Sequence, residues 1–143
     1  MKETNLYDVD FYKWTKTQAD LLNKKQLSDL DLRNLIDEIE SLGRSEKRLL
    51  RSHITNLLSH LLKSDHQPSK KTKSWDNTIN ESLAQIQFII DDSPSFKRLV
   101  PKLTEEAYSL ARFQASRETG IDLNKFPEEC PESYKEYLKF NKN

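Results

Sequence analysis

The chain of 143 residues has one cysteine, one methionine and only two glycines. A single cysteine, Cys130, excludes an internal disulfide and suits a reducing compartment, so we expect a cytoplasmic protein. Two isolated glycines, Gly43 and Gly120, cannot form a glycine-rich phosphate-binding loop. The HExxH motif of zinc proteases and the GxSxG motif of serine hydrolases are also absent. The common signatures of these enzyme classes are therefore missing.

Long apolar runs are missing as well. None approaches the roughly 20 residues that a membrane-spanning helix needs, and residues 1–10 are too polar and acidic for a signal peptide. We therefore expect no membrane partner. An alternating strand pattern is absent too, while 32% of the residues are charged, which favours helices with narrow apolar stripes and solvated outer faces.

One segment carries a strong helical signal. Its apolar residues recur at intervals of three and four, which is typical of a broad helical stripe. They are Leu35, Ile36, Ile39, Leu42, Leu49, Leu50, Ile54, Leu57, Leu58, Leu61 and Leu62. The spacing predicts a long helix over residues 31–64, capped by Asp29 or Asp31. Gly43 interrupts the stripe, so it predicts either a kink or a close approach by another backbone.

The rest of the chain predicts shorter helices. One runs from Asp8 or Asp10 to about Lys24, another begins at Trp75 after a Ser74 cap, and a third covers 102–119 and ends at Gly120. A short helix over 133–140 closes the chain. The predicted fold class is all-α: an antiparallel helical bundle of about four helices with a long second helix and a short C-terminal helix. We expect a single domain over 1–143, with a tail at 1–7 and the bundle at 8–143.

Charge is unevenly distributed, although the net charge is zero. Between Arg44 and Lys73 there are eight basic and two acidic residues, so this basic segment is +6 and the remainder is −6. The eight are Arg44, Lys47, Arg48, Arg51, Lys63, Lys70, Lys71 and Lys73. Two interpretations remain open: a solvated helix face and loop, or a patch for phosphate or an acidic partner. Nucleic-acid binding, if present, would be weak and electrostatic.

The histidines do not predict a metal site. His53 and His60 lie seven residues apart on the long helix, about 10.5 Å along its axis, so they cannot share one ion. The glutamate three residues before a histidine that marks di-iron bundles is also missing. We expect no metal and no cofactor.

One group of side chains remains as a candidate site. If the helices run up and down, then His60, Trp75 and Glu118 meet at one end of the bundle beside the basic loop, and Trp14 approaches the long helix near His53. In the alternative interpretation Trp75 plugs the bundle end and Glu118 bonds a backbone group or the imidazole. His60 and Glu118 are the catalytic candidates. The wider binding set is Trp14, His53, His60, Trp75, Arg44, Arg48, Arg51, Lys63, Lys70, Lys71 and Lys73.

Several ordered motifs support a family resemblance. They are YDVDFYKWT (7–15), LIDEIESLGRSEKRLL (35–50), LLSHLLK (57–63), SWDNTI (74–79), DDSPSF (91–96), and ETG followed by FPEECP (118–131). Together they resemble the domain of unknown function 29 family, which is bacterial and frequent in cyanobacteria, often with many paralogues. The resemblance covers nearly the whole chain. It implies a compact, mostly helical cytoplasmic protein and brings no activity, cofactor or catalytic residue.

Two hypotheses of function follow. The first is a non-enzymatic helical module that binds a protein partner or self-associates, within a small bacterial defence or toxin–antitoxin type locus. The locus idea rests on analogy with families of many paralogues. The second is a hydrolase or nuclease that uses His60 and Glu118. Weak electrostatic binding of nucleic acid is a further alternative.

Overall fold

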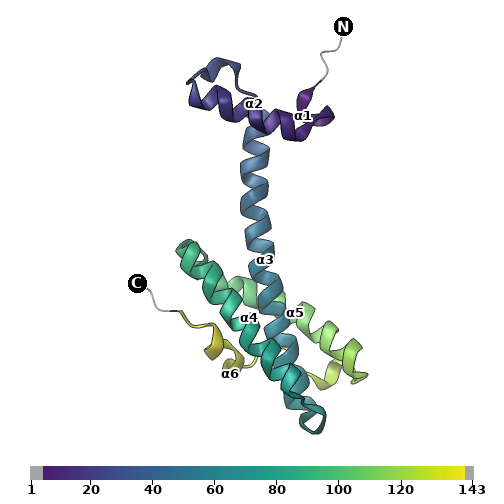
Figure 1. The fold of residues 1–143 in the computed structure, drawn as a ribbon. Coiled ribbons are helices and arrows are strands. Elements are labelled where there is room, and N and C mark those ends of the chain that lie inside the picture. Colours follow the sequence, from purple (N-terminus) through teal and green to yellow (C-terminus); the bar gives the residue numbers. More distant parts are fainter. Residues whose placement is uncertain (1–4, 141–143) are drawn as a thin grey trace. The chain divides into compact units, whose positions relative to one another are not determined.

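The computed structural model describes residues 5–140, which form an all-α protein without β-strands (Figure 1). The α-helices are α1 (Leu6–Val9), α2 (Phe11–Asn23), α3 (Leu32–His66), α4 (Lys73–Asp92), α5 (Val100–Thr119) and α6 (Glu132–Lys135), joined by short 3-10 turns. The predicted fold class is confirmed: α3 is the long second helix of the prediction, and a short helix lies near the C-terminus.

The chain divides by its internal contacts into two compact units, Met1–Arg44 and Ser45–Asn143, and the division falls inside α3. The sequence predicts a single domain with one bundle over 8–143. Helix α1 begins at Leu6, inside the segment expected as a tail. The two units are described separately below.

The first unit is built on polar contacts around Trp14. The Asp10 side chain caps α2 by accepting from the Lys13 N–H at 3.1 Å, as the sequence predicts. Trp14 is buried, and its indole N–H donates to the Asp31 carboxylate at 3.0 Å. Gln18 accepts from the Asp31 N–H at 2.8 Å, and the Tyr7 ring packs edge-on against Trp14. These contacts fix α2 against the start of α3.

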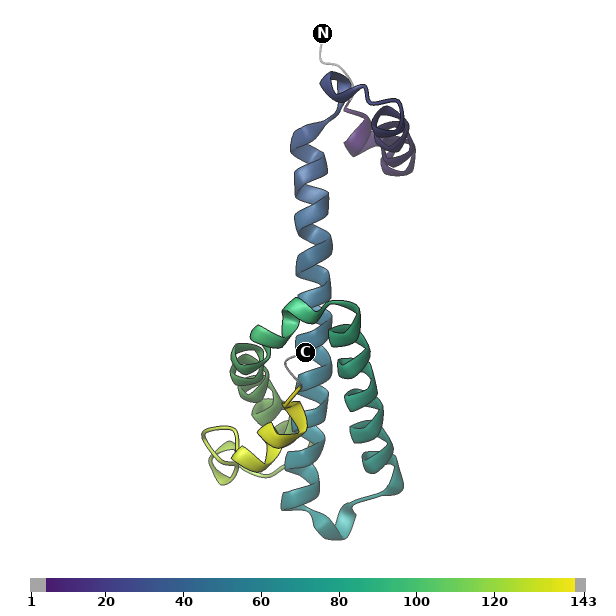
Figure 2. The same ribbon diagram turned by 90° about the vertical axis from the view of Figure 1, so that its left-hand side faces the viewer.

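The second unit contains the main apolar core. In Figure 2, α4 and α5 flank the C-terminal half of α3. The core is formed by Leu50, Ile54, Leu57, Leu58, Leu61 and Leu62 of α3, Ile79, Ile86, Ile89 and Ile90 of α4, Val100, Leu103, Ala107, Tyr108, Ala111 and Ala115 of α5, and Phe126, Tyr134 and Leu138 beyond them. Leu58 and Leu61, which belong to the predicted apolar stripe, are buried. Three alanines at intervals of four on α5 allow close helix packing.

The apolar stripe of α3 is only partly covered. Leu50 and Ile54 are fully buried, whereas Ile36, Ile39 and Leu42 are 52%, 66% and 68% exposed. At Gly43, an added Cβ would meet no atom of the described residues within 4 Å. Among residues 5–140, no other backbone makes the predicted close approach to Gly43. Helix α3 runs through the glycine, because intrahelical hydrogen bonds tolerate an isolated glycine at a small free-energy cost.

Some predicted helix ends are shifted. Thr72, not Ser74, caps α4, and its side chain accepts from the Trp75 N–H. Helix α5 begins at Val100, before Pro101, because proline fits the first turn, where its missing N–H has no intrahelical partner. Gly120 ends α5 in the left-handed conformation at φ 76°, as predicted.

Among the helices formed by residues 5–140, none combines the length and the apolar character that crossing a bilayer requires.

Candidate functional site

The structure brings Glu118 and Trp75 together around Lys63. The Lys63 ammonium, on α3, donates to the Glu118 carboxylate of α5 at 2.6 Å. The same nitrogen lies 5.5 Å from the centre of the Trp75 ring at the start of α4. The Lys63 side chain is only 8% exposed, while that of Glu118 is 42% exposed. One buried cation therefore links three helices of the second unit, through an ion pair and a cation–π contact.

His60 lies one turn before Lys63 on α3. Its Nδ1 lies 2.9 Å from the Asn56 carbonyl oxygen, so Nδ1 is the protonated nitrogen of the neutral ring. Burial lowers the pKa of His60. The hydrogen bond to the Asn56 carbonyl raises the pKa of His60, which opposes the effect of burial. The positive charge of Lys63 lowers this pKa further, and the negative charge of Glu118 raises it. The imidazole is therefore neutral at pH 7, and its Nε2 is left as a potential acceptor.

The Glu118 carboxylate is held in its charged form. The hydrogen bond from Lys63 is the main cause of the lowered pKa of Glu118. Partial burial acts against this lowering, and the positive charge of Lys63 adds to it. Gln114 donates to the other carboxylate oxygen at 3.4 Å. General-acid catalysis near neutral pH needs a carboxyl with a raised pKa. This cluster is better suited to joining helices than to transferring a proton.

Sequence reasoning missed the central role of Lys63, which it counted only as one of the eight cations of the basic segment. The sequence contains one usable signal: Lys63 ends the apolar stripe of α3, and Glu118 ends that of α5, so an up-and-down arrangement brings both to the same end.

Four of the eight basic residues between Arg44 and Lys73 form ion pairs with carboxylates. Arg44 lies 3.8 Å from Glu40, Arg51 lies 3.3 Å from Glu106, and Lys71 lies 3.1 Å from Asp76. Lys63 is the fourth. Arg44 belongs to the first unit, and the other three belong to the second. These carboxylates reduce the field that the +6 segment can exert on a phosphate.

Arg48, Lys70 and Lys73 lie on the second unit. Arg48 borders a small hollow of about 210 Å³ with Arg51, Thr55 and Gln114. Lys70 ends the 3-10 turn after α3, and Lys73 opens α4.

Trp14 and His53 have separate surroundings. Trp14, in the first unit, donates its indole N–H to Asp31, directly before α3. Asn34 is the main cause of the lowered pKa of Asp31, because it donates a side-chain hydrogen bond; Trp14 adds to the shift, and burial opposes it. His53 is half-buried on α3 in the second unit. The Trp14 contacts hold the first unit together.

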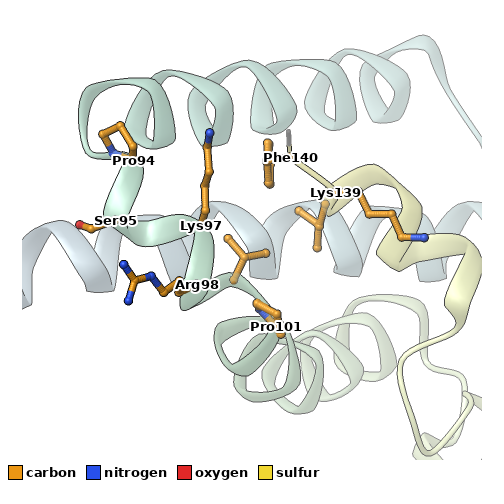
Figure 3. A pocket seen from close by; sticks show the side chains of 9 residues that line it. Pro94, Ser95, Lys97, Arg98, Pro101, Lys139 and Phe140 are labelled. Atoms are coloured by element: carbon orange, nitrogen blue, oxygen red, sulfur yellow. The ribbon is translucent and has the colours of Figure 1, made fainter. Parts of the chain in front are cut away.

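A hollow of about 900 Å³ in the second unit lies between the turn before α5 and the C-terminal segment (Figure 3). It is lined by Pro94, Ser95, Lys97, Arg98, Val100, Pro101, Leu138, Lys139 and Phe140. Lys139 is already bonded to Glu136 at 2.6 Å. A second hollow of about 610 Å³ includes His66 and Arg112, and Arg112 donates to the carbonyls of Leu123 and Phe126. Arg112 therefore supports the loop after α5.

Residues 5–140 contain no group of three His, Cys, Asp or Glu side chains that could hold a metal ion. Burial raises the pKa of the Cys130 thiol to about 11, so this cysteine is protonated and unreactive at neutral pH.

The most unusual surface lies on α3. Leu32, Ile36, Ile39 and Leu42, all in the first unit, are exposed, and we call them the exposed α3 face. Asp31, Asn34, Leu35 and Glu38 are partly covered in the same unit, and Glu38 accepts a hydrogen bond from the Tyr7 hydroxyl. Contiguous apolar side chains in water mark interaction surfaces.

Comparison with protein families gives one match. The model of the family described as Domain of unknown function DUF29 matches residues 6–141, nearly the whole chain. The chain belongs to this family, which confirms the resemblance. Comparison with curated proteins gives no match, and comparison with solved structures gives none either.

Proposed function

We propose that this chain is a non-enzymatic helical module that binds a protein partner, helix against helix, through the exposed α3 face. The observation that carries the proposal is the exposure of Ile36, Ile39 and Leu42 on one helix of the first unit. Covering these side chains with another apolar helix would remove their area from water, at about 25 cal/mol for each Å². We place the protein in the bacterial cytoplasm, within a small defence or toxin–antitoxin type locus.

The hydrolase or nuclease alternative receives less support. Glu118 is ionised and engaged by Lys63, and the Nδ1 of His60 is engaged by a backbone carbonyl. A proton-transfer pair would need one of these groups to have its pKa near the working pH. Electrostatic nucleic-acid binding is weakened by the carboxylates that accompany half of the basic segment.

The test uses purified proteins. Products of genes that recur beside this one are titrated against the chain by calorimetry, and Ile36→Lys with Ile39→Lys is compared with wild type. Phe88→Lys is the control, because Phe88 is a large apolar side chain that is also exposed, on α4 of the second unit. The double variant should lose binding at least tenfold, which corresponds to about 1.4 kcal/mol, while the control and His60→Ala retain it. A partner that binds the double variant as tightly as wild type would contradict the proposal.

A further inference from the structure

The hollow of about 610 Å³ in the second unit is walled by three parts of the chain. His66 lies at the end of α3, Arg112 lies on α5, and residues 124–128 belong to the loop that follows α5. Phe126 connects these parts. Its ring centre lies 4.6 Å from that of His66, and its carbonyl oxygen accepts from Arg112 at 3.3 Å. The volume is within the range of small-molecule sites, roughly 300–1,000 Å³.

The loop that walls this hollow is held in place by the protein itself. Phe126 is only 2% exposed and belongs to the main core. The Tyr108 hydroxyl donates to the Pro127 carbonyl at 2.6 Å, and the Phe126 N–H donates to the Leu123 carbonyl at 3.1 Å. A wall that is already ordered loses little conformational freedom when a ligand binds.

The charge of Arg112 has no opposite charge beside it. Arg112 is half-buried, and its Nη2 donates to the carbonyls of Leu123 and Phe126. Its Nε is buried without a hydrogen-bond partner, and its Nη1 has none among residues 5–140. No carboxylate in this part of the chain lies within 4 Å of the guanidinium. Since a partly buried cation is costly without a counter-charge, an anion in the adjacent hollow would be stabilised.

The other polar side chains of the hollow also have groups without partners in the described chain. They include the ammonium of Lys125, the amide of Asn124 and the carboxylate of Glu128. The Nδ1 of His66 lies 2.9 Å from the Leu62 carbonyl oxygen, so Nε2 is the nitrogen that a ligand could reach. The cations Arg112 and Lys125 against the single carboxylate favour one oxyanion, while Asn124 and Glu128 can accept from a hydroxyl or amino group.

We propose that this hollow binds a small molecule that carries one oxyanion group, a phosphate or a carboxylate, with a hydroxyl or amino group close to it. The oxyanion lies between the Nη1 of Arg112 and the ammonium of Lys125, where charge-assisted hydrogen bonds form. The hydroxyl or amino group lies toward Asn124 and Glu128. This site belongs to the second unit and does not depend on the exposed α3 face of the first.

Nuclear magnetic resonance of the ¹⁵N-labelled full chain tests the site. The chain is titrated at constant ionic strength with glycerol 3-phosphate, with glycerate and with glycerol. We expect saturable shifts of the Lys125 and Phe126 amides and of the His66 ring with at least one of the two anions. The anion that saturates at the lower concentration identifies the oxyanion as phosphate or carboxylate. Absence of saturation with both anions, or equal saturation with glycerol, would overturn the proposal.

Two lysine variants test whether the hollow or the general surface charge binds the anion. Lys125→Gln should raise the dissociation constant of the saturating anion at least fivefold. Lys102→Gln is the matched control, because Lys102 is exposed on α5 and does not line the hollow, and it should bind as wild type. An equal effect of the two substitutions would show non-specific attraction and overturn the site.

A variant that gains affinity protects the test against misfolding. Glu128→Gln removes the one negative charge that lines the hollow and keeps an acceptor oxygen, so it should lower the dissociation constant at least twofold. Glu81→Gln, at an exposed position of α4, removes the same charge elsewhere and should leave the constant unchanged. Weaker or unaltered binding by Glu128→Gln would contradict the placement of the anion beside this carboxylate.

Discussion

At the scale of single residues, Lys63 stands out because a charged ammonium lies almost entirely away from water. It is tolerated because Glu118 supplies the opposite charge at 2.6 Å and Trp75 supplies an aromatic face. Removing one partner of such a pair leaves the other charge poorly solvated.

The first prediction concerns this pair. Glu118→Gln should lower the free energy of unfolding at pH 7 by about 1–2 kcal/mol, since a hydrogen bond to a charged group is typically worth about 1.5–3 kcal/mol and Glu118 is partly exposed. Chemical denaturation measures the loss. Glu81→Gln, on the exposed side of α4, is the control and should change little.

The same variant has a defined pH dependence. The pKa of Glu118 is lower in the folded chain, so the unfolded chain binds its proton first as the pH falls. The stabilisation is therefore complete above the ordinary glutamate pKa and is lost as the pH falls through the folded value. The difference between wild type and Glu118→Gln should shrink below about pH 4. A constant difference down to pH 2 would contradict the ion pair.

At the scale of elements, α3 is one helix with two environments. Its C-terminal half supplies six leucine and isoleucine side chains to the core, while Ile36, Ile39 and Leu42 face water. Hydrophobic periodicity is the same in both halves, so substitutions of the same type should have different effects along the helix.

The second prediction compares buried leucines of α3 with an exposed leucine of α5. Leu58→Ala and Leu61→Ala should each lower the free energy of unfolding by about 2–5 kcal/mol, through lost burial and a residual cavity. Leu110→Ala, at an exposed position of α5, should change it by less than about 0.5 kcal/mol. Urea midpoints give the comparison. If all three midpoints agreed, the packing of α3 described above would be wrong.

The third prediction compares the two glycines. Gly43→Ala should favour the helix and stabilise the monomer by up to about 1 kcal/mol, since its Cβ meets open space. Gly120→Ala should instead destabilise it by about 1 kcal/mol or more, because its φ of 76° strains an L-residue. Thermal unfolding of both variants and wild type measures the two changes. Equal shifts in the same direction would contradict the assigned backbone conformations.

At the scale of the whole molecule, the two units have separate buried centres. The main core is formed by residues 50–138, whereas Trp14 is buried in the first unit with Tyr7 and Asp31 around it. A unit of about 40 residues buries little apolar surface and is only marginally stable.

The fourth prediction follows from this division. Trp14→Ala should remove hydrogen-exchange protection from the amides of α2 while the amides of residues 54–62 remain protected, because a large buried aromatic is lost from the small unit alone. Tyr12→Ala, at an exposed position of the same helix, is the control. Equal loss of protection in both regions would show a single cooperative domain, as the sequence predicts.

The fifth prediction concerns nucleic acid. Duplex DNA should bind weakly, if measurably, because four of the eight basic residues have carboxylate partners. Contact through the other four would give a salt slope of about −3.6. DNA-binding titrations at two salt concentrations compare wild type with a variant in which Lys70, Lys71 and Lys73 are changed to glutamine. The control variant carries the same change at Lys13, Lys16 and Lys24. Tight, salt-insensitive binding would contradict the electrostatic interpretation.

The helices themselves were predictable because their determinants are local. The three-and-four spacing from Leu35 to Leu62, the Asp10 cap and the left-handed Gly120 depend on neighbouring residues, and each appears where the sequence predicts it. The shift of the α4 cap from Ser74 to Thr72 is also local: both side chains can cap, and the register of the first turn selects one.

Tertiary structure decided which parts of these helices are buried. The sequence by itself determined the all-α class and the long helix, because helical periodicity is a property of a single segment. It could not divide the α3 stripe into a buried half and an exposed half, nor identify Glu118 as the partner of Lys63. Both depend on which helices pack against α3, since burial and ion pairing arise between segments far apart in the chain.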